Sequence, residues 1–312
     1  MIGATTLVAA AEGRTGVVSL DAATVLLQWA VGGLAFTWVT TRHREVGLGF
    51  GWIQRGIFAL MAGGAVAAGA RYGGSAVRTL SAVAVALAAI AALAVSIVRK
   101  RAGVSGQRTE HDRRSARVAA MTGIERAGLA VATGDEADDA DDHGPEFPPR
   151  LDLMAPALGV VGLVAAGWAS ASTAPDRLLG VARVVTGAAF LGVVTDAMLL
   201  GHWYLVQPGL PRRLLHELVR WLGWTWPFEV ALLLVPTGML SVLSGSIDDG
   251  YGGMLGWFWV ACAVTTIGLV WVTRAALRER AYSAVMAATG LLYLAILTAF
   301  GTDLVARAVL AG

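Results

Sequence analysis

Four ionisable side chains interrupt long uncharged stretches of this 312-residue sequence: Arg55, Asp196, His202 and Glu229. Carboxyl and imidazole groups in such surroundings can bind and pass protons, and an arginine can hold an anion or neutralise a carboxylate. Ionisable residues are rare inside membrane segments and usually serve ion or proton pathways. Asp196, Arg55 and Glu229 are therefore candidates for a proton path or for an ion pair.

Helical geometry indicates which of these residues can meet. At about 100° per residue, Asp196 shares a helix face with Trp203, whereas His202 points about 120° away from it. Asp196 and His202 are therefore not a local pair. We expect Arg55 to pair with Asp196, with Glu229 competing for the same guanidinium. The alternative is that these charges are structural ion pairs that fix helix packing.

His202 allows three interpretations. It can ligate the iron of a haem b, with His43 or His216 as second axial ligand. It can donate to a quinone carbonyl and pass a proton. It can also be an interfacial histidine bonded to a backbone carbonyl. The candidate cofactor-binding residues are His202, Trp203, Tyr204 and His43, and the cofactor would be a haem b or a quinone.

The composition of the chain indicates the environment in which these ionisable residues lie. Hydrophobic residues make up 56% of the chain and charged residues 15%, with a mean hydropathy of +0.64. A soluble domain carries about 25% charge. Moreover, 19 of the charged residues lie in the single stretch 99–150. These facts exclude a soluble enzyme, a nucleic-acid binder and a disordered chain, and they predict a protein of the lipid bilayer.

Eight uncharged runs are long enough to cross about 30 Å of hydrocarbon. They predict an all-α, polytopic membrane helical bundle of about eight transmembrane helices. The predicted spans cover about 18–40, 49–70, 78–98, 153–174, 181–204, 226–246, 251–273 and 281–304. In this arrangement Arg55, Asp196, His202 and Glu229 all fall in the cytoplasmic half of the membrane.

Basic loops orient the predicted spans. Every odd-numbered span is followed by arginines: Arg42 and Arg44; Arg99 and Arg101; Arg212, Arg213 and Arg220; Arg274, Arg278 and Arg280. The positive-inside rule places these loops in the cytoplasm. We therefore expect a multi-pass protein of the plasma (inner) membrane with both termini outside.

Two segments between the spans have their own character. The segment 99–150 is basic and then acidic with few large apolar residues, which predicts a mainly disordered cytoplasmic linker. It separates a three-helix membrane segment, 1–98, from a five-helix segment, 151–312. Within the latter, 211–222 has one apolar and one charged face, which predicts a helix lying in the cytoplasmic interface.

The motifs of several enzyme classes are absent from the sequence. It holds no Walker loop, HExxH, GxSxG or CxxC pattern, and its one cysteine is Cys262. Whether the chain is an enzyme therefore stays open. Three functions fit: a membrane subunit of a respiratory or other redox complex with a quinone or haem site or a proton path, a proton-coupled transporter of an anionic substrate, or a scaffold that docks a protein partner.

Overall fold

The computed structural model describes residues 20–99, 147–207, 209–235, 238–279 and 281–310. Within these ranges the secondary structure is helical. The helices are α2 (Ala22–Thr41), α3 (Leu48–Tyr72), α4 (Ala76–Val98), the 3-10 turn η3 (Pro149–Leu153), α6 (Met154–Ala169), α7 (Ala174–Val206), α8 (Arg213–Leu234), α9 (Met239–Leu243), α10 (Met254–Ala276) and α11 (Tyr282–Leu310).

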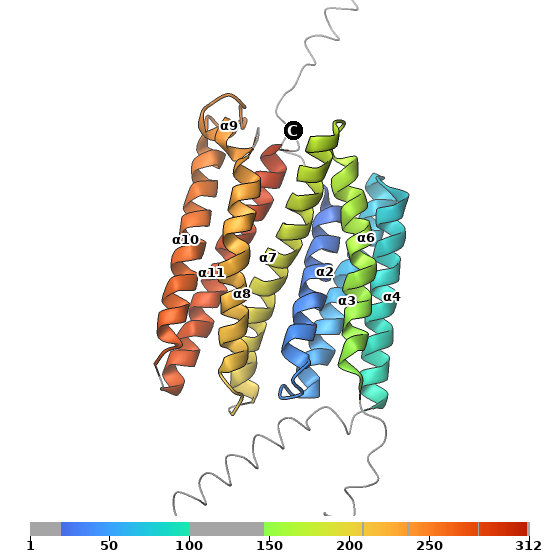
Figure 1. The fold of residues 1–312 in the computed structure, drawn as a ribbon, viewed down its shortest axis with the longest axis vertical. Coiled ribbons are helices and arrows are strands. Elements are labelled where there is room, and N and C mark those ends of the chain that lie inside the picture. The colour runs from blue at the N-terminus through green and yellow to red at the C-terminus, as the bar shows by residue number, and fades with distance from the viewer. Residues whose placement is uncertain (1–19, 100–146, 208, 236–237, 280, 311–312) are drawn as a thin grey trace, which may run out of the picture.

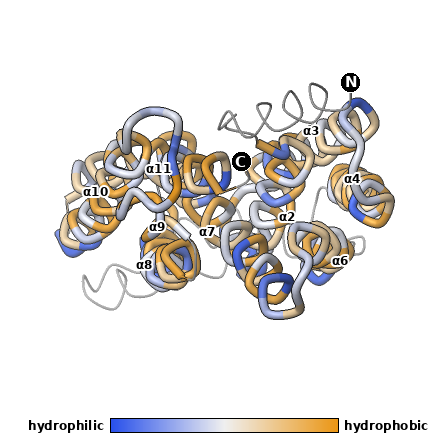
Figure 2. The backbone as a smooth tube through the Cα atoms, turned by 90° about the horizontal axis from the view of Figure 1, so that it is seen from above, coloured by the Kyte–Doolittle hydropathy of each residue, from blue (hydrophilic) through white to orange (hydrophobic). Residues whose placement is uncertain are grey.

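The long helices stand side by side and run up and down between two ends of one bundle (Figure 1). The turns after α2 and α7, with Arg42 and Arg213, lie at one end, which we call the basic end. The turns after α3 and α9, with Asp249, lie at the opposite end. In the end-on view α7 lies between the group α2, α3, α4 and α6 and the group α8, α10 and α11 (Figure 2).

Seven described helical segments are long and apolar enough to cross a membrane, which confirms a multi-pass membrane protein. Their outer faces carry large apolar side chains such as Leu60 and Leu297, which are 78% and 69% exposed. An exposed apolar surface of this extent is unfavourable in water, but lipid solvates it. The bilayer environment therefore follows from both helix length and surface chemistry.

Small residues allow α2 and α7 to lie very close together. A Cβ atom on Gly32 would stand 1.7 Å from the Ala188 carbonyl oxygen, and one on Gly192 would stand 2.2 Å from the Gly32 carbonyl carbon. Only glycine fits at these two positions. The contact holds α7 against α2 and fixes how the polar side chains of these two helices face each other.

Helix α8 differs from the prediction. The expected interfacial helix 211–222 is not a separate element, because one helix runs from Arg213 through Pro227 to Leu234 alongside the other long helices. Its predicted apolar stripe is buried in the core rather than laid on headgroups; the stripe is Leu214, Leu215, Leu218, Val219 and Leu222. The predicted sixth span, 226–246, covers the end of α8, the undescribed residues 236–237 and the short helix α9.

The end of the predicted linker also differs from the expectation. Residues 100–146 lie outside the described part of the chain. Phe147, however, is buried, and η3 begins at Pro149. The structure therefore packs residues before 151 into the bundle and brings Asp152 against α2 and α3.

Candidate functional site

Asp196 lies in the interior of the bundle, on the face of α7 that meets α2 and α3. It is fully buried, and its Oδ1 accepts a hydrogen bond from Nε2 of Gln54 in α3. Its Oδ2 has no hydrogen-bond partner, and neither has Oε1 of Gln54. A buried carboxyl with a single amide donor is under-satisfied, which is unusual in a folded protein. We call Asp196, Gln54 and Thr37 the Asp196 site.

Thr37 completes the Asp196 site from α2. It is fully buried and interacts with the Asp196 carboxyl. Its hydroxyl donates to the Gly33 carbonyl oxygen at 2.9 Å. The Thr37 hydroxyl therefore lies next to both the Gly33 carbonyl oxygen and the Asp196 carboxyl.

Arg55 does not pair with Asp196, and this expectation was wrong. Its Nε and Nη2 each donate to one oxygen of Asp152 at 2.7 Å, and both side chains are buried. Asp152 also accepts from Thr41, and the guanidinium lies 4.6 Å from the ring centre of Phe147. Consecutive helix positions point about 100° apart, so α3 offers Gln54 to α7 and Arg55 to η3.

A small cavity of about 30 Å³ lies beside the Arg55–Asp152 pair at the basic end. Arg44, Gly51, Arg55 and Ser96 are among its lining residues. A cavity of this size can hold a water molecule when polar groups line it. Gly51, which lines the cavity, is about one helical turn from Gln54 along α3.

Glu229 was expected in the same half of the membrane as Arg55 and Asp196, and the structure corrects this. Because α8 starts at Arg213, Glu229 lies near the opposite end of the bundle. It is fully buried and faces Asp303 and Arg307 of α11 and Arg183 of α7. The polar groups therefore form separate sites near the two ends of the bundle rather than one shared cluster.

His202 lies on the outer surface of the bundle, where α7 meets α11. Its Nδ1 is 3.4 Å from the Tyr293 hydroxyl, and the two rings meet edge to face with centres 6.3 Å apart. His43 lies elsewhere, in the turn after α2, where it contacts Arg42 and Glu217. The two histidines share no neighbour, so the geometry gives no support to a haem held between them.

The other candidate cofactor-binding residues have structural contacts. Trp203 donates to Gln207 at 3.2 Å and packs against Phe50, and Gln207 accepts from the Gly47 backbone at 2.9 Å. Tyr204 is buried and donates to the Pro211 carbonyl oxygen. These contacts attach the turns at the basic end to α7.

His43 is kept neutral by its surroundings. Burial and the guanidinium groups of Arg42 and Arg213 lower the pKa of His43, against the smaller opposing effect of Glu217 and Glu45. The Arg42 Nε donates to His43 Nε2 at 3.1 Å, which requires that nitrogen to be unprotonated. His43 is thus part of a charged rim at the basic end.

Several polar residues of these sites were not anticipated from the sequence. Gln54 is uncharged, Asp152 lies next to the predicted linker, and Asp303 and Arg307 lie at the predicted edge of the last span. The spacing of Asp303 and Arg307 is the signal that was available, because residues four apart on a helix meet. Arg307 Nε indeed donates to both oxygens of Asp303, at 2.8 and 2.9 Å.

Within the described residues no group of three or more His, Cys, Asp or Glu side chains is arranged to hold a metal ion. The arrangement instead provides isolated, buried carboxyl groups on facing helices, with amide, hydroxyl and guanidinium neighbours. Comparisons of this chain with protein-family models, with curated proteins and with solved structures find no match.

Proposed function

We propose that this chain is an integral membrane subunit of a redox complex and that it provides a proton path with Asp196 as its central proton-binding group. The observation that carries the proposal is the Asp196 site, a fully buried carboxyl with one oxygen unpartnered. A buried carboxylate without an opposite charge is unfavourable by several kcal/mol, and taking up a proton removes that cost. Such a group exchanges protons wherever water reaches it.

The surroundings of Asp196 support access from the basic end. The cavity beside Arg55 lies one helical turn from Gln54, and Gln54 contacts Asp196. In this proposal eight helices cross the membrane, and α8 is one of them. The positive-inside rule then assigns the basic end to the cytoplasm. Protons would then reach Asp196 from the cytoplasm. The Gly32–Gly192 contact closes the bundle beyond it.

The proposal is tested by replacing Asp196 with Asn, which keeps the shape of the side chain but cannot exchange a proton. In liposomes that contain a pH-sensitive dye, the wild-type protein should speed the decay of an imposed pH gradient, and D196N should reduce the rate to that of empty liposomes. Glu217→Gln, which alters a partly exposed carboxylate at the basic end, is the matched control. A wild-type rate equal to that of empty liposomes, or a D196N rate equal to the wild-type rate, contradicts the proposal.

A quinone site at His202 is the second candidate function, and the His202–Tyr293 pair favours it. Tyr293 is 43% exposed and His202 is also exposed, on a surface that faces lipid. The contact with Tyr293 uses Nδ1, and Nε2 has no partner among the described residues. A quinone arriving through the lipid would meet a histidine that can donate to its carbonyl oxygen and pass a proton.

His202→Ala should weaken the binding of a quinone to the detergent-purified protein about tenfold, which corresponds to the loss of one hydrogen bond. Binding is measured by the quenching of tryptophan fluorescence with ubiquinone and menaquinone analogues of short tail. The control is His216→Ala, since His216 contacts the Leu277 carbonyl oxygen away from this surface. Equal affinities in the two variants, or no saturable binding to the wild type, would remove His202 from a quinone site.

A further inference from the structure

A second polar site lies near the opposite end of the bundle and brings four long helices together. Gln28 of α2, Arg183 of α7, Glu229 of α8, and Asp303 and Arg307 of α11 form it, and we call it the Glu229 site. Gly187 keeps room for it, because a Cβ there would stand 2.1 Å from Gln28 and 2.6 Å from Asp303. Along α7 the site is separated from Asp196 by about 20 Å at 1.5 Å per residue.

Hydrogen bonds in the Glu229 site satisfy every charged group except one. Arg307 binds both oxygens of Asp303 through Nε, and its Nη2 donates to the Arg183 carbonyl oxygen at 3.0 Å. Arg183 donates to the carbonyl oxygens of Leu232 and Val235, at 2.8 and 2.9 Å. Both carboxyl oxygens of Glu229 lack a partner, although the side chain is fully buried.

The charges that face Glu229 come from two helices. Asp303 and Arg307 belong to α11, and Arg183 belongs to α7. Arg307 is already neutralised by Asp303, and the guanidinium donors of Arg183 are turned to backbone oxygens. The group that remains as a hydrogen-bond partner for Glu229 is therefore the carboxylate of Asp303, with which it interacts. Two carboxyl groups in one buried site are compatible when they hold one proton between them.

We propose that Glu229 and Asp303 share one proton and form a second proton-binding site, with Arg307 as the compensating positive charge. The proton provides the hydrogen that the Glu229 carboxyl otherwise lacks: an O–H of Glu229 donates to an Asp303 oxygen, and Asp303 remains the charged member bound to Arg307. This leaves one negative charge beside one guanidinium, which is an arrangement that a low-dielectric interior tolerates.

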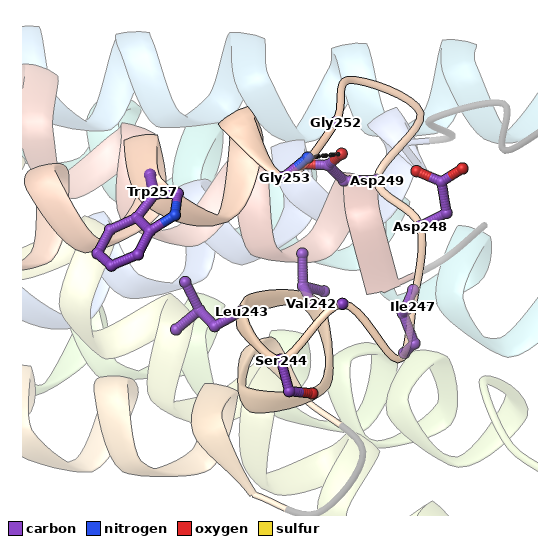
Figure 3. Close-up of a pocket in the computed structure, with 10 residues that line it drawn as sticks. Val242, Leu243, Ser244, Ile247, Asp248, Asp249, Gly252, Gly253 and Trp257 are labelled. Carbon is purple, nitrogen blue, oxygen red and sulfur yellow. Dashed lines mark hydrogen bonds between the residues drawn. The ribbon is translucent and has the colours of Figure 1, made fainter.

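An apolar layer and a cavity lie between this carboxyl pair and the opposite end of the bundle. Leu233 and Ala306, each about one turn beyond the two carboxyls, pack with Met239 and Val242 of α9 and with Trp259 of α10. Val242 also lines a cavity of about 400 Å³ between α9 and the turn that precedes α10 (Figure 3). The carboxyl pair is thus separated from an open cavity by little more than the side chains of α9.

Acidic residues line the same cavity. Asp249 accepts from the backbone N–H of Gly253 at 2.8 Å (Figure 3). It also accepts from the backbone N–H of Leu255 at 2.8 Å. Burial alone would raise the pKa of the Asp249 carboxyl, but these N–H groups, with that of Tyr251, lower the pKa below its usual value. Asp249 therefore stays ionised near neutral pH, and with Asp248 it makes the cavity attractive to protons and other cations.

The shared proton rests on the burial of Glu229, on its two unpartnered oxygens and on its interaction with Asp303. The use of this proton as the second step of the path through Asp196 rests on the proposed function. The Asp196 site and the Glu229 site lie on opposite sides of the Gly32–Gly192 contact. A proton would therefore pass between them only when that contact loosens. Between the two sites, the indole N–H of Trp29 donates to Thr195 at 2.9 Å. An indole N–H is only a donor, so Trp29 cannot relay a proton from one site to the other.

Infrared spectroscopy of the purified full-length protein tests the shared proton without any transport assay. A protonated carboxyl has a carbonyl stretching band that shifts in D₂O, and we expect Glu229→Gln to remove one such band that Asp196→Asn retains. Glu217→Gln should leave all of these bands in place. Glutamine has the shape of the protonated glutamate, so E229Q should fold. Asp303→Asn provides a second measurement. It changes the group that accepts the hydrogen bond from Glu229, so the carbonyl band of Glu229 should shift in frequency.

Two outcomes would overturn the proposal: an E229Q spectrum with every protonated-carboxyl band of the wild type, or a D303N spectrum in which the band assigned to Glu229 keeps its frequency. These results are independent of the liposome assay. If the bands behave as expected and D196N still dissipates a pH gradient, the proton path fails while the shared proton stands. If D196N is inactive and the protonated-carboxyl bands of E229Q and D303N match those of the wild type, the proton path stands and its second proton-binding site is not the Glu229 site.

Discussion

Replacing Arg55 with Ala should lower the free energy of unfolding by about 3–5 kcal/mol, because the change leaves Asp152 as a buried charge without its partner. The side chains of Arg55 and Asp152 are only 3% and 2% exposed, and two parallel hydrogen bonds of 2.7 Å join them. The pair fastens η3 to α3, so its loss should also release the start of α6. Thermal unfolding of the protein in detergent, followed by circular dichroism, measures the effect.

Two comparisons separate this buried pair from an ordinary ion pair. Arg42→Ala removes the partner of Glu217 at the basic end, where the side chains are 31% and 17% exposed, and should cost no more than about 1 kcal/mol. The double variant R55M/D152L should recover most of the stability lost in R55A, because it removes both charges and fills the space with apolar atoms. If R55A is no less stable than R42A, the pair does not hold η3 in place.

Apolar runs predicted the positions of most helices, because lipid admits a backbone only when its polar groups bond within the helix. The runs at 49–70 and 78–98 correspond to α3 (Leu48–Tyr72) and α4 (Ala76–Val98). Uncharged runs did not identify α8 as a single helix. Its first half carries arginines, so the uncharged runs placed the start of the sixth span at residue 226 rather than 213. In the structure Arg274 lies against Gly223, whose carbonyl is the one that Pro227 leaves without a helical donor.

The partners of the polar residues could not be predicted in the same way. Periodicity places Gln54 and Arg55 about 100° apart on one helix, but it does not say which neighbouring helix lies on each side. The sequence therefore suggested the Coulombic pair Arg55–Asp196, whereas packing joins Arg55 to Asp152 and gives Asp196 an amide. Similarly, the position of Glu229 along the membrane depended on where α8 begins, and a helix boundary shifted by a dozen residues moved it to the other half.

The close approach of α2 and α7 explains why the polar residues of these two helices meet at all. Gln28 and Thr37 lie on α2 on either side of Gly32, and Gly187 and Asp196 lie on α7 on either side of Gly192. Each polar site is therefore built on the same helix–helix contact. A change that widens this contact should disturb both sites at once, even though it touches no ionisable group.

Gly32→Ala is the smallest such change, and it should lower the free energy of unfolding by roughly 3 kcal/mol, the upper part of the range for overpacking. The new Cβ would lie 1.7 Å from the Ala188 carbonyl oxygen and 3.2 Å from the Gly192 Cα, and backbone atoms cannot move aside without separating the helices. Because the separation would also withdraw Thr37 from Asp196, proton flux through liposomes should fall together with stability.

Gly63→Ala is the matched control, since a Cβ at Gly63 of α3 meets no atom within 4 Å. Alanine is the better helix former, so this variant should gain about 0.5–1 kcal/mol. The same chemical change thus has opposite expected signs at the two positions, and the thermal unfolding midpoints of the two variants should move in opposite directions. Equal shifts would mean that the α2–α7 contact can relax, and the bundle would then not need glycine to hold its two polar sites in register.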